Sequence, residues 1–508
     1  MKIFKTYKHE IRFHLLINLC IAVFISIASY IHIPLGTAKA YFIYVGHFFI
    51  LQFTFFGFIY FLSLFKRAFS ILFPIFFVLF SGFSFWEYSQ NISVNTGLIQ
   101  AILETKPDIA VDIMNVPFIT YLLASLLTAI FCIKKFHTLE NNTLKSPLSI
   151  LAVIAIGCFF VIENKRSDTL KRRIPYSVVF GFQKYLQKPN LRLKEVKENV
   201  ISNENGLEII LVLGESLRAD HLYLNGYHRN TTPLLSQQKN LISFKNLYTP
   251  LTYTSTSVPQ LLTDKSISDT NEKALTSLYS ILKKANFHTK WVGNQSLEKS
   301  YKSIVNTNDS VIIIDKFHSA FSFKKEKDIS LLKHYQPNKP FIKNSITTFH
   351  MIGSHWYYNS RYGDAFKKYT PIVASKHLGS SSTAQLINSY DNTIVYFDFF
   401  LNSLINNIKK ENKNTLLIYV SDHGETLGEE GKWFHGIAHK TSQNPAMLIW
   451  YSDHFGIKNE LKIKRLQAIE NDSISSNFLF HSILDIAKIE GFKYQTKESI
   501  FSRSAEIE

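Results

Sequence analysis

The chain has 508 residues, of which 46% are hydrophobic, and it carries a formal net charge of +17. Such a charge suits a protein that works beside an anionic lipid surface. Nucleic acid is the competing partner for a basic chain, but no helix-turn-helix, RNA-binding or zinc-finger pattern is present, which argues against it. The three cysteines, Cys20, Cys132 and Cys158, all fall inside apolar runs, so we expect no disulfide bond elsewhere.

The first third of the chain contains long apolar runs rich in Phe, Ile and Leu: 13–33, 41–65, 69–86, 118–133 and 149–162. Spanning the hydrocarbon core of a bilayer takes about 20 apolar residues. The first two runs meet this length, whereas the last two are short and need tilt or flanking residues to span. A cleaved signal peptide would explain at most the first run. We therefore predict a transmembrane anchor of five helices over residues 1–163.

Basic residues predict the orientation of this anchor. They lie before the first run, between the second and third, and after the fourth: Lys2, Lys5, Lys8, Arg12, Lys66, Arg67, Lys134 and Lys135. The segments 34–40 and 87–117 are poor in Lys and Arg. Because cytoplasmic loops carry the excess of these residues, the N-terminus is predicted to be cytoplasmic and everything after residue 163 to lie outside.

The rest of the chain is predicted to be a connector and one α/β domain. In the connector, 164–205, the spacing at 176–186 is typical of an amphipathic helix on a membrane surface. From 206 to 508, apolar β-branched runs alternate with helical patterns. The runs are 208–213, 289–292, 310–315, 346–352 and 415–420, and the helical patterns are 273–286, 383–410 and 472–490. This alternation predicts a largely parallel central sheet.

Metal-type ligands follow two of these predicted strands. Glu215 comes directly after the run 208–213, and Asp422 and His423 come after 415–420. Ligands of open α/β sheets bind at the carboxyl ends of the strands, and carboxylate and imidazole groups are zinc ligands. Asp-His pairs also occur in ordinary turns, and Glu215 could instead cap a helix that begins near Ser216.

Two more histidines and a hydroxyl cluster complete the candidate set. His355 closes the apolar segment 349–355, and His435 follows Asp422 at short range. Segment 248–259 is rich in Thr, Ser and Tyr, and a metal could activate one of its hydroxyls as a nucleophile. Such a cluster is also common in solvated loops and helix caps. These residues alone predict a membrane-anchored α/β protein that is a zinc hydrolase or transferase.

Several motifs, taken in order, resemble a known family. They are the segments 214–221, 225–233, 291–295, 350–355, 389–393 and 421–428. Together they look like the bacterial phosphoethanolamine transferases, membrane-anchored members of the alkaline phosphatase and sulfatase superfamily. The resemblance covers essentially the whole outer domain, and a five-helix anchor is also the architecture of that family. It implies an alkaline phosphatase/sulfatase-like α/β domain in the periplasm, attached to the bacterial inner membrane by a multi-pass anchor.

The resemblance also implies a role for individual residues. The phosphate-accepting threonine falls on Thr254, with Thr256 as the alternative if the match slips by two residues. His350 matches a family histidine for which a structural role is at least as plausible. The implied zinc ligands are Glu215, Thr254, Asp422 and His423, for one tightly bound ion. His355 and His435 match residues that bind substrate phosphate or a second zinc, and either could donate a proton in catalysis.

The implied reaction is a transfer of phosphoethanolamine between two lipids. Thr254 would take the group from phosphatidylethanolamine, forming a covalent phospho-enzyme, and pass it to lipopolysaccharide, either lipid A or an inner-core sugar. In the best-known lipid A enzymes, the loop between the third and fourth spans carries three substrate-contacting residues. Here Thr105 survives, whereas Ala101 and Ile109 replace the other two, and Glu104 could compensate. This departure favours an inner-core sugar as the acceptor.

Three alternatives remain at this stage. A glycerol-phosphate transferase of the lipoteichoic acid synthase type would share both the five-helix anchor and the threonine nucleophile. A plain sulfatase is less consistent with the sequence, because the Cys/Ser-x-Pro-x-Arg pattern of that group is missing. A catalytically inactive lipid-binding module is disfavoured because every implied zinc ligand is present.

Overall fold

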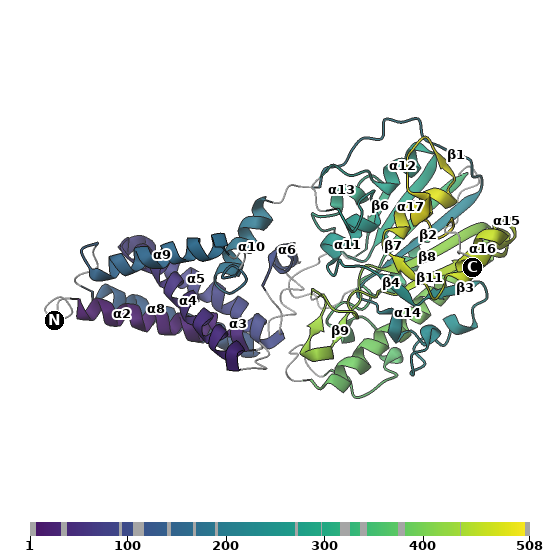
Figure 1. Ribbon diagram of the computed structural model, residues 1–508. Helices are drawn as coiled ribbons and strands as arrows, with labels where there is room; N and C mark the ends of the chain where they lie inside the picture. Colours follow the sequence, from purple (N-terminus) through teal and green to yellow (C-terminus); the bar gives the residue numbers. More distant parts are fainter. Residues whose placement is uncertain are drawn as a thin grey trace. The chain divides into compact units, whose positions relative to one another are not determined.

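A computed structural model describes residues 7–31, 38–90, 94–104, 116–139, 144–165, 169–187, 191–269, 273–295, 297–314, 326–335, 343–373, 381–436 and 438–502 (Figure 1). The described residues up to 103 and from 116 to 187 form one compact unit, and those from 191 onward form another. The domain boundaries given above, at 163 and 205, remain predictions.

The first unit is helical. Its elements are α2 (Lys8–Ile21), η1 (Ala22–Ser26), α3 (Ala28–Ile31), α4 (Ala38–Ser63), α5 (Lys66–Gln90), α6 (Thr96–Glu104), α8 (Val116–His137), α9 (Pro147–Lys165) and α10 (Tyr176–Gln187). Within the described residues, five helical spans are long and apolar enough to cross a membrane, as predicted. Flanking residues lengthen the last two runs, giving helices of 22 and 19 residues. The helix predicted at 176–186 is present as α10, while its place on a membrane surface stays a prediction.

Aromatic side chains hold this helical unit together. Phe69 stacks on Phe73 with ring centroids 4.9 Å apart and lies 4.4 Å from the ring of Phe136 in α8. All three side chains are buried. Aromatic pairs of this kind contribute about 0.5–1.5 kcal/mol beyond their buried area, so the many Phe residues join neighbouring helices.

The second unit is built on a seven-stranded sheet, with the order β3-β11-β8-β2-β7-β5-β6. Its strands are β2 (Leu207–Gly214), β3 (Leu241–Phe244), β5 (Phe287–Gly293), β6 (Ser310–Ile313), β7 (Asn344–His350), β8 (Asn414–Ser421) and β11 (Met447–Tyr451). Strands β6, β5, β7, β2 and β8 run parallel, while β11 pairs antiparallel with both β8 and β3. The predicted, mostly parallel sheet is therefore confirmed.

The register of the three central strands positions the candidate ligands. Leu213 in β2 pairs with Val420 in β8 on one side and with His350 in β7 on the other. Gly214 pairs with Ser421. Parallel strands in this register end at one edge of the sheet, so the segments that follow β2, β7 and β8 begin side by side.

Helices cover both faces of the sheet. They are α11 (Thr254–Leu261), α12 (Leu278–Lys284), α13 (Lys302–Val305), α14 (Thr383–Glu411), α15 (Asp453–Lys458), α16 (Glu460–Ala468) and α17 (Phe478–Ile486). One buried cluster joins α12 and α17 to one face, and a second joins α14 to the other. The central strand β2 is buried throughout, which is typical of a parallel sheet covered on both faces. Short two-stranded sheets complete the unit: β1 (Ile201–Ser202) with β13 (Ile489–Glu490), β4 (Asn246–Tyr248) with β12 (Ser473–Ser475), and β9 (Thr426–Leu427) with β10 (Trp433–Phe434).

Candidate active site

Ligand side chains from two strand ends meet at the edge of the sheet. Glu215 follows β2, and Asp422 and His423 follow β8. All three are buried, and one ligand atom from each lies within 4.8 Å of the others. The structure therefore brings together the three side chains that the sequence proposed as metal ligands. The alternative reading of Glu215 as a helix cap is wrong, because Ser216 has a φ of 57° and no α-helix begins there.

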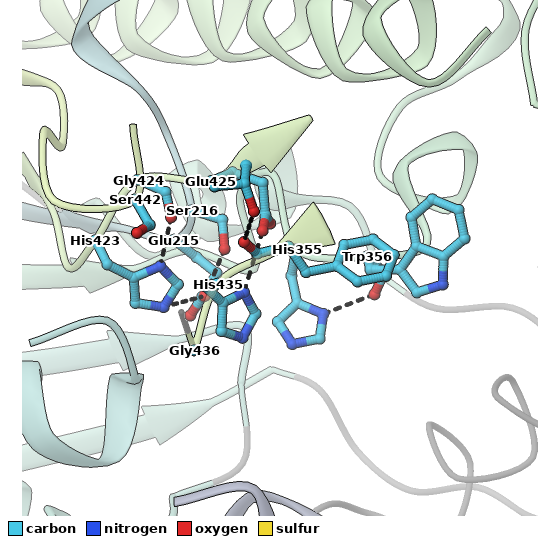
Figure 2. Close-up of polar contacts among 12 residues, drawn as sticks. Glu215, Ser216, His355, Trp356, His423, Gly424, Glu425, His435, Gly436 and Ser442 are labelled. Atoms are coloured by element: carbon cyan, nitrogen blue, oxygen red, sulfur yellow. Dashed lines mark hydrogen bonds and ion pairs between the residues drawn. The ribbon is translucent and has the colours of Figure 1, made fainter. Parts of the chain in front are cut away.

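Hydrogen bonds fix the orientation of Asp422 and His423. Asp422 Oδ1 accepts from the backbone N–H groups of Ser216 at 3.2 Å and His423 at 2.8 Å. The His423 Nδ1–H donates to the carbonyl of Gly424 at 2.9 Å, which leaves the Nε2 lone pair free to bind a cation (Figure 2). A partner on the other ring nitrogen is usual for metal-binding histidines.

The same three residues fit a metal ion by their chemistry. Asp422 Oδ2 and His423 Nε2 are buried and take part in no hydrogen bond with any described residue. Nε2 lies 3.3 Å from Asp422 Oδ2 and 3.4 Å from Glu215 Oε1. Burial, with the charge of Glu215, raises the pKa of Asp422 well above its usual range. A divalent cation would offset this crowding of carboxylates.

Thr254 places a hydroxyl group against this cluster. It is the first residue of α11, and its Oγ1 donates to Glu215 Oε2 at 3.0 Å. The alternative nucleophile, Thr256, donates instead to the backbone carbonyl of Tyr253 at 2.9 Å. Thr254 thus contacts a ligand carboxylate directly, whereas the hydroxyl of Thr256 is engaged within its own helix.

His355 and His435 lie beside the cluster. The ring of His435 is 4.4 Å from that of His423 and 5.8 Å from that of His355, measured between centroids. The His355 Nδ1–H donates to the carbonyl of Trp356 at 2.6 Å, so its Nε2 carries the lone pair. Shielding from water lowers the pKa of His355 to about 4, which keeps the ring neutral near pH 7.

Glu425 belongs to the site but was not predicted from the sequence. Its carboxylate is fully buried, and its Oε1 lies 3.5 Å from Nδ1 of His435 (Figure 2). Burial alone would lower the pKa of His435, but the charge of Glu425 and its contact with the ring raise the value to about 9. The signal available in the sequence was the position of Glu425, two residues after His423.

Gln295 is a second residue without a predicted role. Its side-chain amide donates to Glu215 Oε2 at 3.3 Å and to the carbonyl of Met351 at 2.6 Å. It therefore joins a ligand carboxylate to the segment after β7 that carries His355. The sequence drew attention to 291–295 as a motif but gave no reason to single out this amide.

The other predicted residues lie away from the cluster or outside the described residues. His350, at the end of β7, is fully buried and packs edge-on against Trp291 and Tyr301, with centroids 5.3 and 5.7 Å away. This packing agrees with a structural role. Glu104 is the last residue of α6, and its side chain, like all of Thr105, falls outside the described part of the chain.

The Thr254 hydroxyl lies against buried metal-type ligands at the carboxyl edge of a parallel sheet. This arrangement is typical of metal-dependent group-transfer and hydrolytic sites. The sulfatase family model matches residues 208–489, more than half of the chain. The chain belongs to the sulfatase family.

Similarity to individual proteins extends over most of the chain. It is 25% identical over 455 residues to phosphoethanolamine transferase EptA of Escherichia coli K12, with 81% of each chain covered. The integral membrane lipooligosaccharide phosphoethanolamine transferase A of Neisseria meningitidis has a TM-score of 0.83 at 22% identity, over 97% of this chain and 98% of that one. The C-terminal periplasmic domain of EcEptC from Escherichia coli, solved in complex with zinc, has a TM-score of 0.53 at 23% identity. The match covers 62% of this chain and 91% of that one.

These findings confirm the resemblance and the fold predicted from the sequence. The described residues hold five N-terminal helices that are long and apolar enough to cross a membrane, followed by a C-terminal α/β domain, and this fold matches that of the Neisseria protein along the whole chain. The relatives that match along most of its length are phosphoethanolamine transferases, in agreement with the predicted enzyme class.

Proposed function

We propose that this chain transfers phosphoethanolamine from phosphatidylethanolamine to lipopolysaccharide through a covalent intermediate on Thr254. The observation that carries the proposal is the contact of the Thr254 hydroxyl with Glu215, within the cluster completed by Asp422 and His423. The names of the matched relatives support phosphoethanolamine as the transferred group.

Zinc is the metal that this donor set fits best. Glu215 and Asp422 would offer carboxylate oxygens, His423 would offer Nε2, and Thr254 would offer Oγ1, a set of oxygen and nitrogen donors that suits zinc. The zinc complex of the EcEptC domain supports the choice of metal. When bound, zinc would lower the pKa of the Thr254 hydroxyl and offset negative charge on the phosphoryl oxygens.

The first half of the reaction would load Thr254. Its Oγ1 forms a bond to the phosphorus of phosphatidylethanolamine, while the bond from phosphorus to the glycerol oxygen breaks. Glu215 Oε2, which accepts the Thr254 hydrogen bond at 3.0 Å, is placed to take the hydroxyl proton as the bond to phosphorus forms and to return it when Thr254 is released. His435, oriented by Glu425, is placed to give a proton to the departing diacylglycerol oxygen.

The second half would return Thr254 to its free state. An acceptor hydroxyl or phosphate oxygen attacks the phosphorus, and the bond from phosphorus to Thr254 Oγ1 breaks. His355, whose Nε2 carries a lone pair, is placed beside His435 to bind the acceptor or take its proton. We propose an inner-core sugar or lipid A as acceptor, and a location in the bacterial inner membrane with the α/β domain in the periplasm. The Lys and Arg residues before the first apolar run, between the second and third, and after the fourth support that orientation, because cytoplasmic loops carry an excess of these residues.

Intact-mass analysis of the full-length protein tests this function. After incubation in vesicles that contain phosphatidylethanolamine, we expect a phosphoethanolamine adduct that peptide mapping places on Thr254. Thr254→Ala should abolish the adduct and transfer to lipopolysaccharide, while Glu215, Asp422 and His423 still retain zinc when the ion is supplied in excess. Thr256→Ala is the matched control and should retain both the adduct and the transfer to lipopolysaccharide.

Two outcomes would overturn the proposal. Loss of the adduct in Thr256→Ala, with Thr254→Ala unaffected, would move the nucleophile by two residues. A glycerol-phosphate adduct from phosphatidylglycerol, in place of phosphoethanolamine, would favour the lipoteichoic acid synthase type of reaction.

A further inference from the structure

The helical unit contains a large apolar cavity. Its volume is about 510 Å³, and every residue that lines it is aliphatic or aromatic. The lining comes mainly from α4, α5, α9 and α10, the helices labelled in the first unit in Figure 1. The hydroxyl of Tyr176, which is one of the lining residues, donates to Thr54 Oγ1 at 3.0 Å and so is already satisfied within the protein. Ligand sites have volumes of about 300–1,000 Å³, whereas water needs polar partners that this cavity does not offer.

The cavity is open where its lining residues reach the outer surface of the helices. Phe76 of α5, Phe160 of α9 and Val179 of α10 are 41%, 62% and 47% exposed. Helices α5 and α9 are long and apolar enough to cross a membrane, so this surface faces hydrocarbon in a bilayer. The molecules that can enter from that side are lipid chains.

Opposite charges border the cavity beside α10. The Lys171 ammonium lies 4.6 Å from the ring centroid of Phe180, which lines the cavity. Glu163 Oε2 lies 4.0 Å from the same ammonium. Lys171 and Glu163 are 31% and 5% exposed in their side chains, so the cation is the more accessible of the two. The predicted orientation puts this end of the cavity on the outer side of the membrane.

We propose that the cavity holds one acyl chain of the ethanolamine phospholipid that serves as donor, an inference that rests on the function proposed above. The headgroup of such a lipid carries one phosphate and one primary ammonium. Lys171 would attract the phosphate. Glu163 Oε1 accepts from the backbone N–H of Leu170 at 2.6 Å, so Oε2, the oxygen on the side of Lys171, would attract the ammonium. A choline headgroup cannot donate a hydrogen bond to Glu163, because its quaternary nitrogen carries no proton.

Photo-crosslinking tests the site without relying on activity. The full-length protein is placed in phosphatidylcholine vesicles with a small fraction of phosphatidylethanolamine that carries a diazirine in the middle of one acyl chain. We expect labelled peptides from α4, α5, α9 and α10 that include the lining residues. The same diazirine on phosphatidylcholine should label them much less. Equal labelling by both probes, or labelling spread over all lipid-facing helices, would overturn the assignment.

A cavity-filling variant tests the consequence for turnover. Val179→Trp fills the opening, whereas Val153→Trp places the same side chain on the exposed face of α9, 60% exposed and outside the lining. With a long-chain donor, Val179→Trp should raise KM about tenfold, which corresponds to about 1.4 kcal/mol. With a dihexanoyl donor, whose chains are too short to fill the cavity, both variants should match the wild type.

The two proposals fail in different ways. If no donor of any chain length forms an adduct on Thr254, the proposed function is wrong. If the adduct forms with long-chain donor equally well in the wild type and in Val179→Trp, the function stands and the cavity does not hold the donor chain. Should Val179→Trp not fold, the crosslinking pattern of the wild-type protein still decides the question.

Discussion

Gln295 offers a sharp test of how the ligand carboxylate of Glu215 is held. Its amide donates to Glu215 Oε2 at 3.3 Å, while Thr254 Oγ1 and Ser216 Oγ each donate to the carboxylate at 3.0 Å. Gln295→Leu therefore removes one of three side-chain donors and leaves the other two. A hydrogen bond to a charged group contributes about 1.5–3 kcal/mol, and the long distance places this one at the lower end.

We expect Gln295→Leu to weaken zinc binding by about tenfold, the lower bound for losing a partner of a metal ligand. Titration calorimetry of the full-length protein with zinc measures this change. Gln385→Leu is the matched control, because the amide of Gln385 donates to the carbonyl of Ile372 at 3.2 Å, outside the site. Unchanged zinc affinity in folded Gln295→Leu, or an equal loss in Gln385→Leu, would refute the reasoning.

Four further changes have definite expected outcomes. Glu425→Gln removes the charge beside His435 and should lower kcat about 10- to 100-fold with zinc content unchanged, and a change confined to KM would contradict the assigned role. Leu211→Ala, in the buried centre of β2, should cost about 2–5 kcal/mol in chemical denaturation. Asp391→Ala removes a buried carboxylate that accepts hydrogen bonds from three described side chains, and it should lower the free energy of unfolding by about 3–5 kcal/mol. The control Asp364→Ala, at an exposed position, should lower it by less than about 0.5 kcal/mol. Chelation of zinc should lower Tm, and added zinc should restore it, because the ion binds the folded state.

The regular helices and strands were predictable because buried positions are occupied by apolar residues at regular spacing in the sequence. Strands β2 and β8 read as continuous apolar runs since both faces of the sheet are covered. In the edge strand β3 (Leu241–Phe244), side-chain burial alternates over only four residues. A segment this short cannot be distinguished from a loop in the sequence. Helix α11 was not predicted for another reason: its start is rich in Thr and Ser, which favour turns and helix caps over helix interiors.

The candidate site was predictable only where strand ends marked it. Glu215 and His423 follow long apolar runs, so their convergence could be inferred from the parallel order of strands. Glu425 and Gln295 contact His435 and Glu215, and such contacts depend on three-dimensional distances that no spacing encodes. The resemblance to a known family supplied Thr254, which the hydroxyl cluster alone did not distinguish from Thr256.

Because the backbone N–H of Ser216 binds the carboxylate of Asp422, two points 206 residues apart in the chain must meet before the metal centre exists. In the proposed orientation, a polypeptide emerging on the outer side of the membrane has no complete set of the proposed zinc ligands until β8 has been delivered and paired with β2. If the proposed zinc site and orientation hold, we expect metal loading to follow translocation of most of the domain, so that partly translocated chains contain little zinc.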